Sequence, residues 1–507
     1  MTYLSSTRFV RSSFGFVLPV LSILMGCGVD HDSKQESSDI VRTPKFSDSD
    51  ILSLEDPDCD PQRLTGKMGP ETLIWMADST GQIRQQKFDM REFSTVGLRN
   101  QYIRGTYWHD DFETLDSGQK AESIESILAD YLPKKSLNSF RSSTDQSLKM
   151  IGFCKPNGGY KRNSLENVAL AMAVGVRQTY QFSYQQLRSQ GIMLPRINLI
   201  AQLKLMLPKS EWENPEVPEY FSDNASWFMS NSSPQEYFIS SFPQSRVFFD
   251  RYQYSYWEIP SIFGHEYGHH IFRQIMRFQT QDTIEGRMLG AINEGFSDLS
   301  SWLSLRNSST MYQQLIIDDP SNKTRNPDSA AIELLLPDPS TLTLIQRNFP
   351  KKVDENFVNY FTSDSSASDT VISVEELIRQ DLHLSGAALA HIFWKFSETS
   401  NPTVDFMKIQ ELNIKWVNKI NRIREQTTGL QPTSLSLFKL YIQEMIRVIW
   451  DSVPFDQQDV TGRKLHSLMQ KLIPGLSKSL DLPDSLQAFG PRSHDVASEE
   501  LLRLITN

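Results

Sequence analysis

The residues with the clearest chemical potential are two histidines, His265 and His269, which stand four positions apart in the segment GHEYGHH (264–270). Residues four apart on a helix share one face, so both imidazoles can reach one metal ion. Neutral imidazole binds Zn²⁺ at about 2.0–2.1 Å. Glu266 borders the open side of such an ion, where a general base would take a proton from an attacking water. The spacing therefore predicts a metal site on a helix, with a carboxylate base beside it.

A catalytic zinc site needs three protein ligands and one open position, so a third ligand must follow. Residues 273–277 (RQIMR) contain no histidine, which excludes the metzincin pattern of a third histidine shortly after His269. The segment GAINEGFSD (290–298) instead offers Glu294 and Asp298, which share one helix face. Glu294 can complete the ligand set. Asp298 can bond the far nitrogen of a ligand histidine and fix its tautomer.

Together these two segments resemble the gluzincins, and among them the thermolysin-like metalloproteases. The resemblance covers about residues 165–400. It implies that His265, His269 and Glu294 bind Zn²⁺, that Glu266 is the catalytic base and that Asp298 supports a ligand histidine. It also implies a two-lobe zincin fold, with a β-containing N-terminal lobe, a mainly helical C-terminal lobe and the active-site helix between them.

Two shorter segments extend the resemblance. Asn224 and Ala225, in the segment DNASW (223–227), are similar to an edge strand that binds peptide substrates by β-augmentation. An ordinary strand end with a turn-forming Asn is the alternative interpretation. His383, in DLHLSG (381–386), resembles the histidine that stabilises the tetrahedral intermediate, although the family pattern has one more residue before its Ser-Gly pair. These matches predict that Asn224 and Ala225 bind substrate and that His383 is a second catalytic residue.

The sequence departs from the pattern of the thermolysin-like metalloproteases in two places. No Tyr lies between His270 and Glu294, where the relatives place another donor to the oxyanion. Ser261 stands where the calcium-binding relatives carry Asp, which speaks against a calcium site of their kind. We therefore expect zinc as the cofactor and treat calcium as weakly supported.

The elements that must position these residues predict an α+β protein, because strand-like segments precede residue 255 and helix-like segments follow it. Strands are predicted at 196–207, 224–229 and 236–250. Helices are predicted at 119–132, 164–187, 258–276, 289–305, 383–398, 406–424, 434–450 and 461–472. The predicted division is a signal peptide (1–26), a disordered tether (27–60), an N-terminal region of unknown role (61–160), a β-containing catalytic lobe (161–280) and a helical lobe (281–507).

The first residues resemble a bacterial lipoprotein signal. Arg8 and Arg11 precede an apolar stretch at 14–26, which is too short to span a bilayer. The segment LMGC (24–27) resembles a lipobox, in which Cys27 becomes the acylated first residue. An ordinary cleaved signal, with Cys27 incidental, is the alternative. Gly28 follows the cysteine, which by resemblance favours the outer membrane, so we expect a lipid-anchored protein of the bacterial cell envelope.

Cysteine usage agrees with export, because the chain has only 3 cysteines. If Cys27 is acylated, Cys59 and Cys154 remain; they either pair as a disulfide or stay as two separate buried thiols. Two thiols cannot form an all-cysteine zinc site. Any tight metal site must therefore use histidines and carboxylates.

The net charge and the apolar content of the sequence argue against some classes of function. The net charge is −10, which argues against nucleic acid as a partner, and no apolar run reaches the roughly 18 residues of a membrane span. We expect an exported, lipid-anchored zinc endopeptidase that acts on peptides or proteins. An aminopeptidase would carry a Gly-x-Met-Glu-Asn-type segment upstream of His265, and none is present. The alternative from another class is a surface lipoprotein that binds a partner through a zincin scaffold with little or no turnover.

Overall fold

The computed structural model describes residues 52–108 and 148–202, apart from positions 53, 79–81 and 158, and then 225–229, 236–241, 255–276, 284–305, 382–399, 405–427 and 434–454, with single positions from 458 to 465. Its helices are η2 (Pro61–Arg63), α4 (Leu165–Ser189), η6 (Tyr256–Glu258), α7 (Pro260–Met276), α8 (Ile284–Leu305), α14 (Leu382–Thr399), α15 (Phe406–Thr427) and α16 (Ser434–Trp450). Its strands are β1 (Thr72–Ala77), β2 (Ile83–Phe88), β3 (Ile103–Trp108), β4 (Leu148–Met150), β5 (Ile197–Ile200), β6 (Ala225–Met229) and β7 (Tyr237–Ser241).

Two sheets form the β part of the described structure. β1 and β2 make an antiparallel hairpin. The other sheet has five strands in the order β4-β3-β5-β7-β6. β3, β5 and β7 run parallel, whereas β4 and β6 are antiparallel strands at the two edges. β4 and α4 lie in the connection between the parallel neighbours β3 and β5, and a helix is the usual element of such a crossover.

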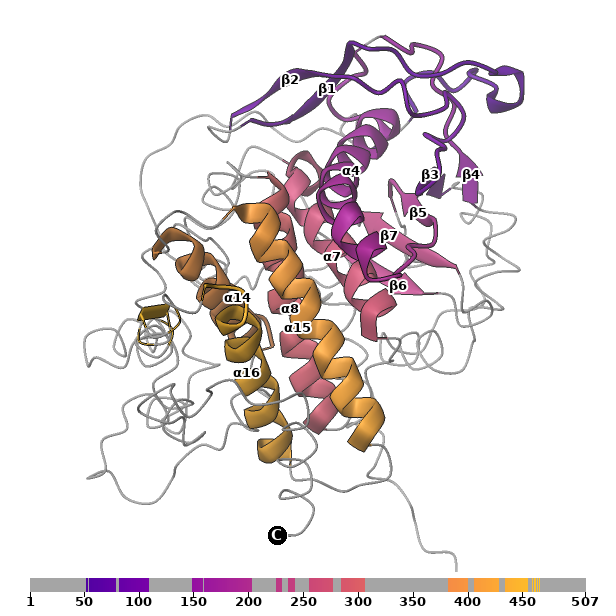
Figure 1. Ribbon diagram of the computed structural model, residues 1–507. Helices are drawn as coiled ribbons and strands as arrows, with labels where there is room; N and C mark the ends of the chain where they lie inside the picture. Colours follow the sequence, from indigo (N-terminus) through magenta and orange to yellow (C-terminus); the bar gives the residue numbers. More distant parts are fainter. Residues whose placement is uncertain are drawn as a thin grey trace, which may run out of the picture.

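Helices cover the sheet in successive layers (Figure 1). α4 packs against β1, β3 and β5, and α7 packs against β6 and β7. α8 lies against α7 on the side away from the sheet, and α14 packs against α8. α15 contacts α4, α7 and α8, and α16 covers α15. α7 is therefore enclosed between the sheet and α8, and this enclosure buries nearly all of its residues.

Glycines allow the helices around α7 to approach closely. A Cβ atom at Gly264 would lie 2.8 Å from Thr179 Oγ1 of α4 and 2.9 Å from Ser301 Oγ of α8. One turn later, a Cβ at Gly268 would lie 2.5 Å from the Cα of Ser297. Real Cβ atoms do not make such contacts, so α7 reaches both neighbouring helices only because these positions lack a side chain.

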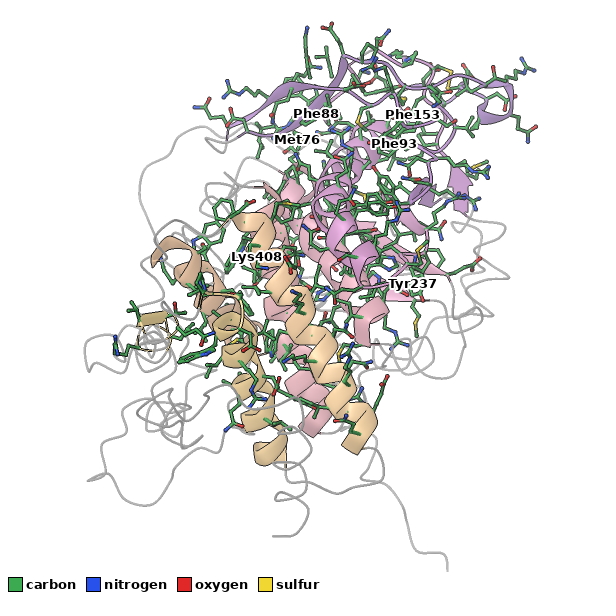
Figure 2. The ribbon with its side chains drawn as sticks, in the orientation of Figure 1. Met76, Phe88, Phe93, Phe153, Tyr237 and Lys408 are labelled. Atoms are coloured by element: carbon green, nitrogen blue, oxygen red, sulfur yellow. A yellow bond between two sulfur atoms is a disulfide. The ribbon has the colours of Figure 1, made fainter. Side chains whose placement is uncertain are left out.

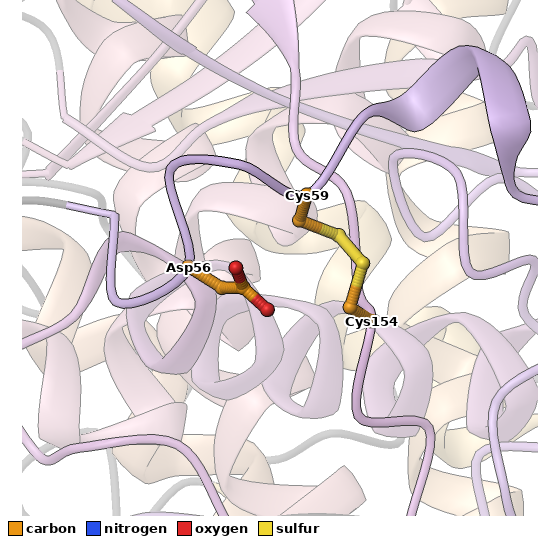
Figure 3. A group of neighbouring side chains, drawn as sticks. All are labelled: Asp56, Cys59 and Cys154. Carbon is orange, nitrogen blue, oxygen red and sulfur yellow. A yellow bond between two sulfur atoms is a disulfide. The ribbon is translucent and has the colours of Figure 1, made fainter.

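A different set of contacts holds the N-terminal part of the chain. Cys59 and Cys154 form a disulfide, and Asp56 lies beside it (Figure 3). The buried carboxylate of Glu166, in the first turn of α4, accepts the backbone N–H groups of Glu55 and Asp56. The disulfide and these hydrogen bonds together fasten the segment before η2 to the start of α4.

Apolar packing supports this fastening. Buried side chains, including Met76, Phe93 and Phe153, fill the space between the hairpin and α4 (Figure 2). Leu52 joins the same core. The predicted tether therefore ends before Leu52, because residues 54–60 are also part of the packed body rather than free chain.

The described structure confirms the α+β class. Six predicted helices correspond to α4, α7, α8, α14, α15 and α16, with ends that differ by at most five residues, whereas β1 to β4 were not predicted. α8 starts five residues earlier than predicted, and β5 ends at Ile200, seven residues before the predicted end. β3 and β4 show that the region 61–160 contributes strands to the same sheet as β5, β6 and β7. The predicted helix at 119–132, residues 1–51 including Cys27, and Asn224 lie outside the described residues. No helix within the described ranges has the length and apolarity that a bilayer crossing requires.

Candidate metal centre

The short helix η6 fixes the backbone just before α7. Ser255 and Glu258 form a capping box at η6, and Pro260 follows as the first residue of α7, where its missing N–H costs nothing. Arg162 Nε lies 2.5 Å from Glu258 Oε1, and its Nη2 donates to Oε2 at 2.8 Å. Glu258 is fully buried, and burial raises the pKa of its carboxyl against the opposing effect of Arg162. This ion pair ties the start of α7 to the residues just before α4.

Both predicted histidines face a carboxylate from α8. His265 Nε2 lies 3.3 Å from Glu294 Oε2, and His269 Nε2 lies 3.7 Å from Glu294 Oε1. The imidazoles themselves are 4.5 Å apart between ring centroids. Ligand atoms of His265, Glu266 and His269 also lie within 4.8 Å of one another. This buried group could hold a metal ion.

The other nitrogen of each ring is bonded to α8. Asp298 Oδ1 lies 2.8 Å from His265 Nδ1, and Ser297 Oγ lies 2.9 Å from His269 Nδ1. Both α8 side chains are fully buried. Burial also lowers the pKa of His269, which favours the neutral imidazole that a metal requires. One face of α8 therefore presents the Glu294 carboxylate to the Nε2 atoms of the two histidines. The same face holds the Nδ1 atom of each ring through Asp298 and Ser297.

Glu266 is held by the edge strand of the sheet. The backbone N–H of Trp227, in β6, donates to Glu266 Oε2 at 2.7 Å. In the antiparallel ladder with β7, neighbouring residues of β6 alternate between pointing toward β7 and pointing away. The Trp227 N–H points away from β7, so Glu266 bonds the side of β6 that forms the sheet edge within the described residues. The carboxylate and the edge strand thus border the same site.

α14 packs directly on the turn of α8 that carries Glu294. A Cβ at Gly386 would lie 2.6 Å from the backbone nitrogen of Gly295 and 2.7 Å from Glu294 Cβ. His383 lies in the first turn of α14, and its side chain lies outside the described part of the structure. The start of α14 therefore contacts the metal centre through Gly386.

The neighbouring His270 has a structural role. Its Nε2 lies 3.1 Å from the backbone oxygen of Pro195, and its ring packs against Tyr237 and Trp227. Burial lowers the pKa of His270 to about 4. This histidine faces the sheet, away from Glu294, as expected for a residue outside the ligand set.

The structure brings together the predicted residues that it describes at this centre: His265, Glu266, His269, Glu294 and Asp298. Ala225 lies in β6, two residues from Trp227. Sequence reasoning missed the contributions of Ser297, Gly386 and the Trp227 backbone. Ser297 stands in the NEGFSD segment beside Asp298, so its position three residues after Glu294 was a usable signal. The N–H of Trp227 gave no signal in the sequence, because every residue except Pro supplies a backbone N–H.

Comparison with known proteins adds no relative. No protein-family model matches the chain, and no curated protein or solved structure matches it either.

Proposed function

We propose that this protein is a zinc-dependent endopeptidase, in which His265, His269 and Glu294 hold the metal. The observation that carries the proposal is the spacing of 3.3 Å and 3.7 Å between the two Nε2 atoms and the Glu294 oxygens. Ligand atoms at about 2.0–2.1 Å from a tetrahedral zinc ion stand about 3.3–3.4 Å apart. The two distances end on different oxygens of Glu294; the first matches this separation and the second exceeds it by about 0.3 Å, so a small adjustment of the carboxylate would bring the donor set to zinc geometry. When bound, zinc supplies Lewis-acid polarisation of the substrate carbonyl and lowers the pKa of water.

Glu266 is the general base in this proposal. Its carboxylate lies next to the histidine pair, and the Trp227 N–H holds one of its oxygens in place. The carboxylate would accept a proton from the attacking water and return it to the leaving amine. A site that only held a structural metal would need no carboxylate at this position.

A peptide substrate would lie along β6, the edge of the five-stranded sheet in the described residues. An extended chain can add to such an edge by backbone hydrogen bonding. Asn224 and Ala225 are the proposed contacts, because Ala225 begins the strand whose Trp227 reaches Glu266 and Asn224 precedes it in the sequence. His383, one turn before Gly386 on α14, is the proposed donor to the developing oxyanion. A two-lobe zincin arrangement, export and a lipid anchor at Cys27 belong to the same proposal.

The test compares wild type with Glu266→Gln for zinc content and for hydrolysis of a mixed peptide library. We expect both proteins to bind zinc equally, and the variant to lose at least about 100-fold in cleavage, since a general base contributes roughly 10²–10⁴. Glu411→Gln is the control and should cleave normally, because the Glu411 carboxylate pairs with Lys408 and Lys415 on its own helix α15. Wild-type cleavage by Glu266→Gln would refute the role of Glu266. Zinc binding with no cleavage by wild type would favour the alternative of a non-catalytic binding protein.

Replacement of Glu294 tests the ligand set. Glu294→Ala should weaken zinc binding by more than the roughly 10- to 100-fold expected for residues behind the ligands, because a direct ligand is removed. The measurement is competition with a chelator of known affinity. An unchanged zinc affinity would exclude Glu294 as a ligand.

A further inference from the structure

The two histidines of the metal centre differ in the group that supports each ring. The carboxylate of Asp298 bonds His265 Nδ1 at 2.8 Å, and the hydroxyl of Ser297 bonds His269 Nδ1 at 2.9 Å. Both supporting residues come from α8, three and four positions after Glu294. Both are fully buried. The difference between the two supports is therefore chemical rather than one of exposure.

The two groups impose different constraints on a ring. An ionised carboxylate only accepts hydrogen bonds, so Asp298 requires a proton on Nδ1 of His265 and leaves the lone pair on Nε2. A hydroxyl both donates and accepts, so Ser297 is compatible with a proton on either nitrogen of His269. The side chain of Asn293, also on α8, is a further hydrogen-bonding neighbour of this ring. Only the tautomer with the proton on Nδ1 can offer Nε2 to a metal.

Close packing places the Ser297 hydroxyl at His269. Gly268 precedes His269 on α7, and a Cβ at Gly268 would lie 3.0 Å from Ser297 Oγ and 2.5 Å from Ser297 Cα. The missing side chain at Gly268 lets the α8 backbone approach the ring. Because Ser297 is fully buried, bulk water does not reach its hydroxyl and cannot replace it in the hydrogen bond.

We propose that Ser297 is the positioning residue for His269 and that its hydroxyl leaves the tautomer of His269 to be selected when the metal binds. His265 is then a ligand preset by Asp298, and His269 is the adaptable ligand. This inference rests on the metal centre of the proposed function. It assigns the hydroxyl a role in metal affinity that is separate from any role in packing.

The experiment compares Ser297→Ala with Ser301→Ala. Ser301 is a matched control because it is also a fully buried serine of α8, and its hydroxyl donates to the backbone oxygen of Ser261 at 2.7 Å instead of bonding a histidine. Ala is smaller than Ser and favours helices, so neither variant introduces a steric clash. Zinc affinity is measured by chelator competition, and the imidazole tautomers are read from ¹H–¹⁵N NMR of the metal-free full chain.

We expect Ser297→Ala to lower zinc affinity about 10-fold or more, and Ser301→Ala to leave it within about twofold. In metal-free wild type, His265 should show one tautomer with the proton on Nδ1, and His269 a mixture. Equal zinc affinities for Ser297→Ala and Ser301→Ala would overturn the positioning role. A single tautomer of His269 in the metal-free protein would overturn its adaptability. If wild type bound no zinc, the proposed function would fail, and the NMR comparison would still test the contact between Ser297 and His269.

Discussion

The metal centre and the N-terminal region are held together by different means. Around the metal centre, α7, α8 and α14 approach so closely that Gly264, Gly268, Gly295 and Gly386 have no room for a side chain. Asp298 and Ser297 bond the two histidines across the interface between α7 and α8. In the N-terminal region, the hairpin and its loops are fastened by the Cys59–Cys154 disulfide and by ion pairs that reach the surface.

The difference reflects a different physical requirement in each region. Short strands and loops bury little surface of their own, so a covalent bond compensates for the chain entropy that their ordering costs. The metal centre instead requires several side chains to be positioned within fractions of an ångström, which packed helices do better than loops. None of the contacts described above at the metal centre involves Cys59 or Cys154, so we expect loss of the disulfide to leave the metal centre nearly unaffected.

Removal of the disulfide should have the largest effect on stability. The bond joins residues 95 positions apart, and a loop of that length corresponds to about 4–5 kcal/mol in the chain-entropy model, with 2–5 kcal/mol typical of measurements. The double variant Cys59→Ser, Cys154→Ser should lose stability in denaturant unfolding, whereas its zinc affinity in the folded state should stay at the wild-type value. A zinc affinity that fell together with stability would show that the two regions are coupled.

A side chain at Gly268 should have the next largest effect on stability and, unlike loss of the disulfide, should also lower zinc affinity. Its Cβ would meet the Cα of Ser297 at 2.5 Å, so Gly268→Ala must separate α7 from α8. We expect a loss of about 1–3 kcal/mol in stability and a clear loss of zinc affinity. Gly66→Ala is the control in the N-terminal region, because a Cβ there lies 3.8 Å from Thr95 Oγ1, an ordinary contact. Full zinc affinity in Gly268→Ala would mean that the helix separation is not critical for the ligands.

The same two regions differ in how far the sequence predicted them. His265, Glu266 and His269 lie on one helix, and the spacing of Glu294 and Asp298 is equally local, so the helical period alone predicted which side chains share a face. The meeting of the two faces was an expectation of the family resemblance, and the distances to Glu294 agree with it.

Contacts between distant segments were less accessible to sequence reasoning. The disulfide remained one of two alternatives, since pairing depends on a chain path that spacing does not encode. The ordered residues 54–60 were assigned to a tether from their polar composition, yet Glu166 binds their backbone N–H groups, which composition does not report. The strand contributed by 103–108 was also missed, because its parallel partner lies far along the chain.

The smallest expected effect concerns Glu55, which belongs to the fastened N-terminal segment. Burial raises the pKa of its carboxyl, but hydrogen bonds from Lys155 Nζ and the Lys161 N–H outweigh it and lower the pKa below 4.5. A lowered pKa in the folded state stabilises the protein above the unfolded value, and this stabilisation is lost as the pH falls through the folded value. Glu55→Gln should therefore lower the free energy of unfolding at pH 7 by up to about 1 kcal/mol, and less at pH below about 4.

Urea unfolding of Glu55→Gln and wild type between pH 3 and 8 measures this difference. Glu71→Gln is the matched control, since Glu71 pairs with Lys87 in the same region but its side chain is 66% exposed. An exposed pair contributes at most a few tenths of a kcal/mol, so this variant should nearly match wild type at pH 7. A Glu55 effect that was constant across the pH range would mean that its charge does not fasten the segment. The disulfide and the backbone bonds to Glu166 would then hold it without help from the ion pair.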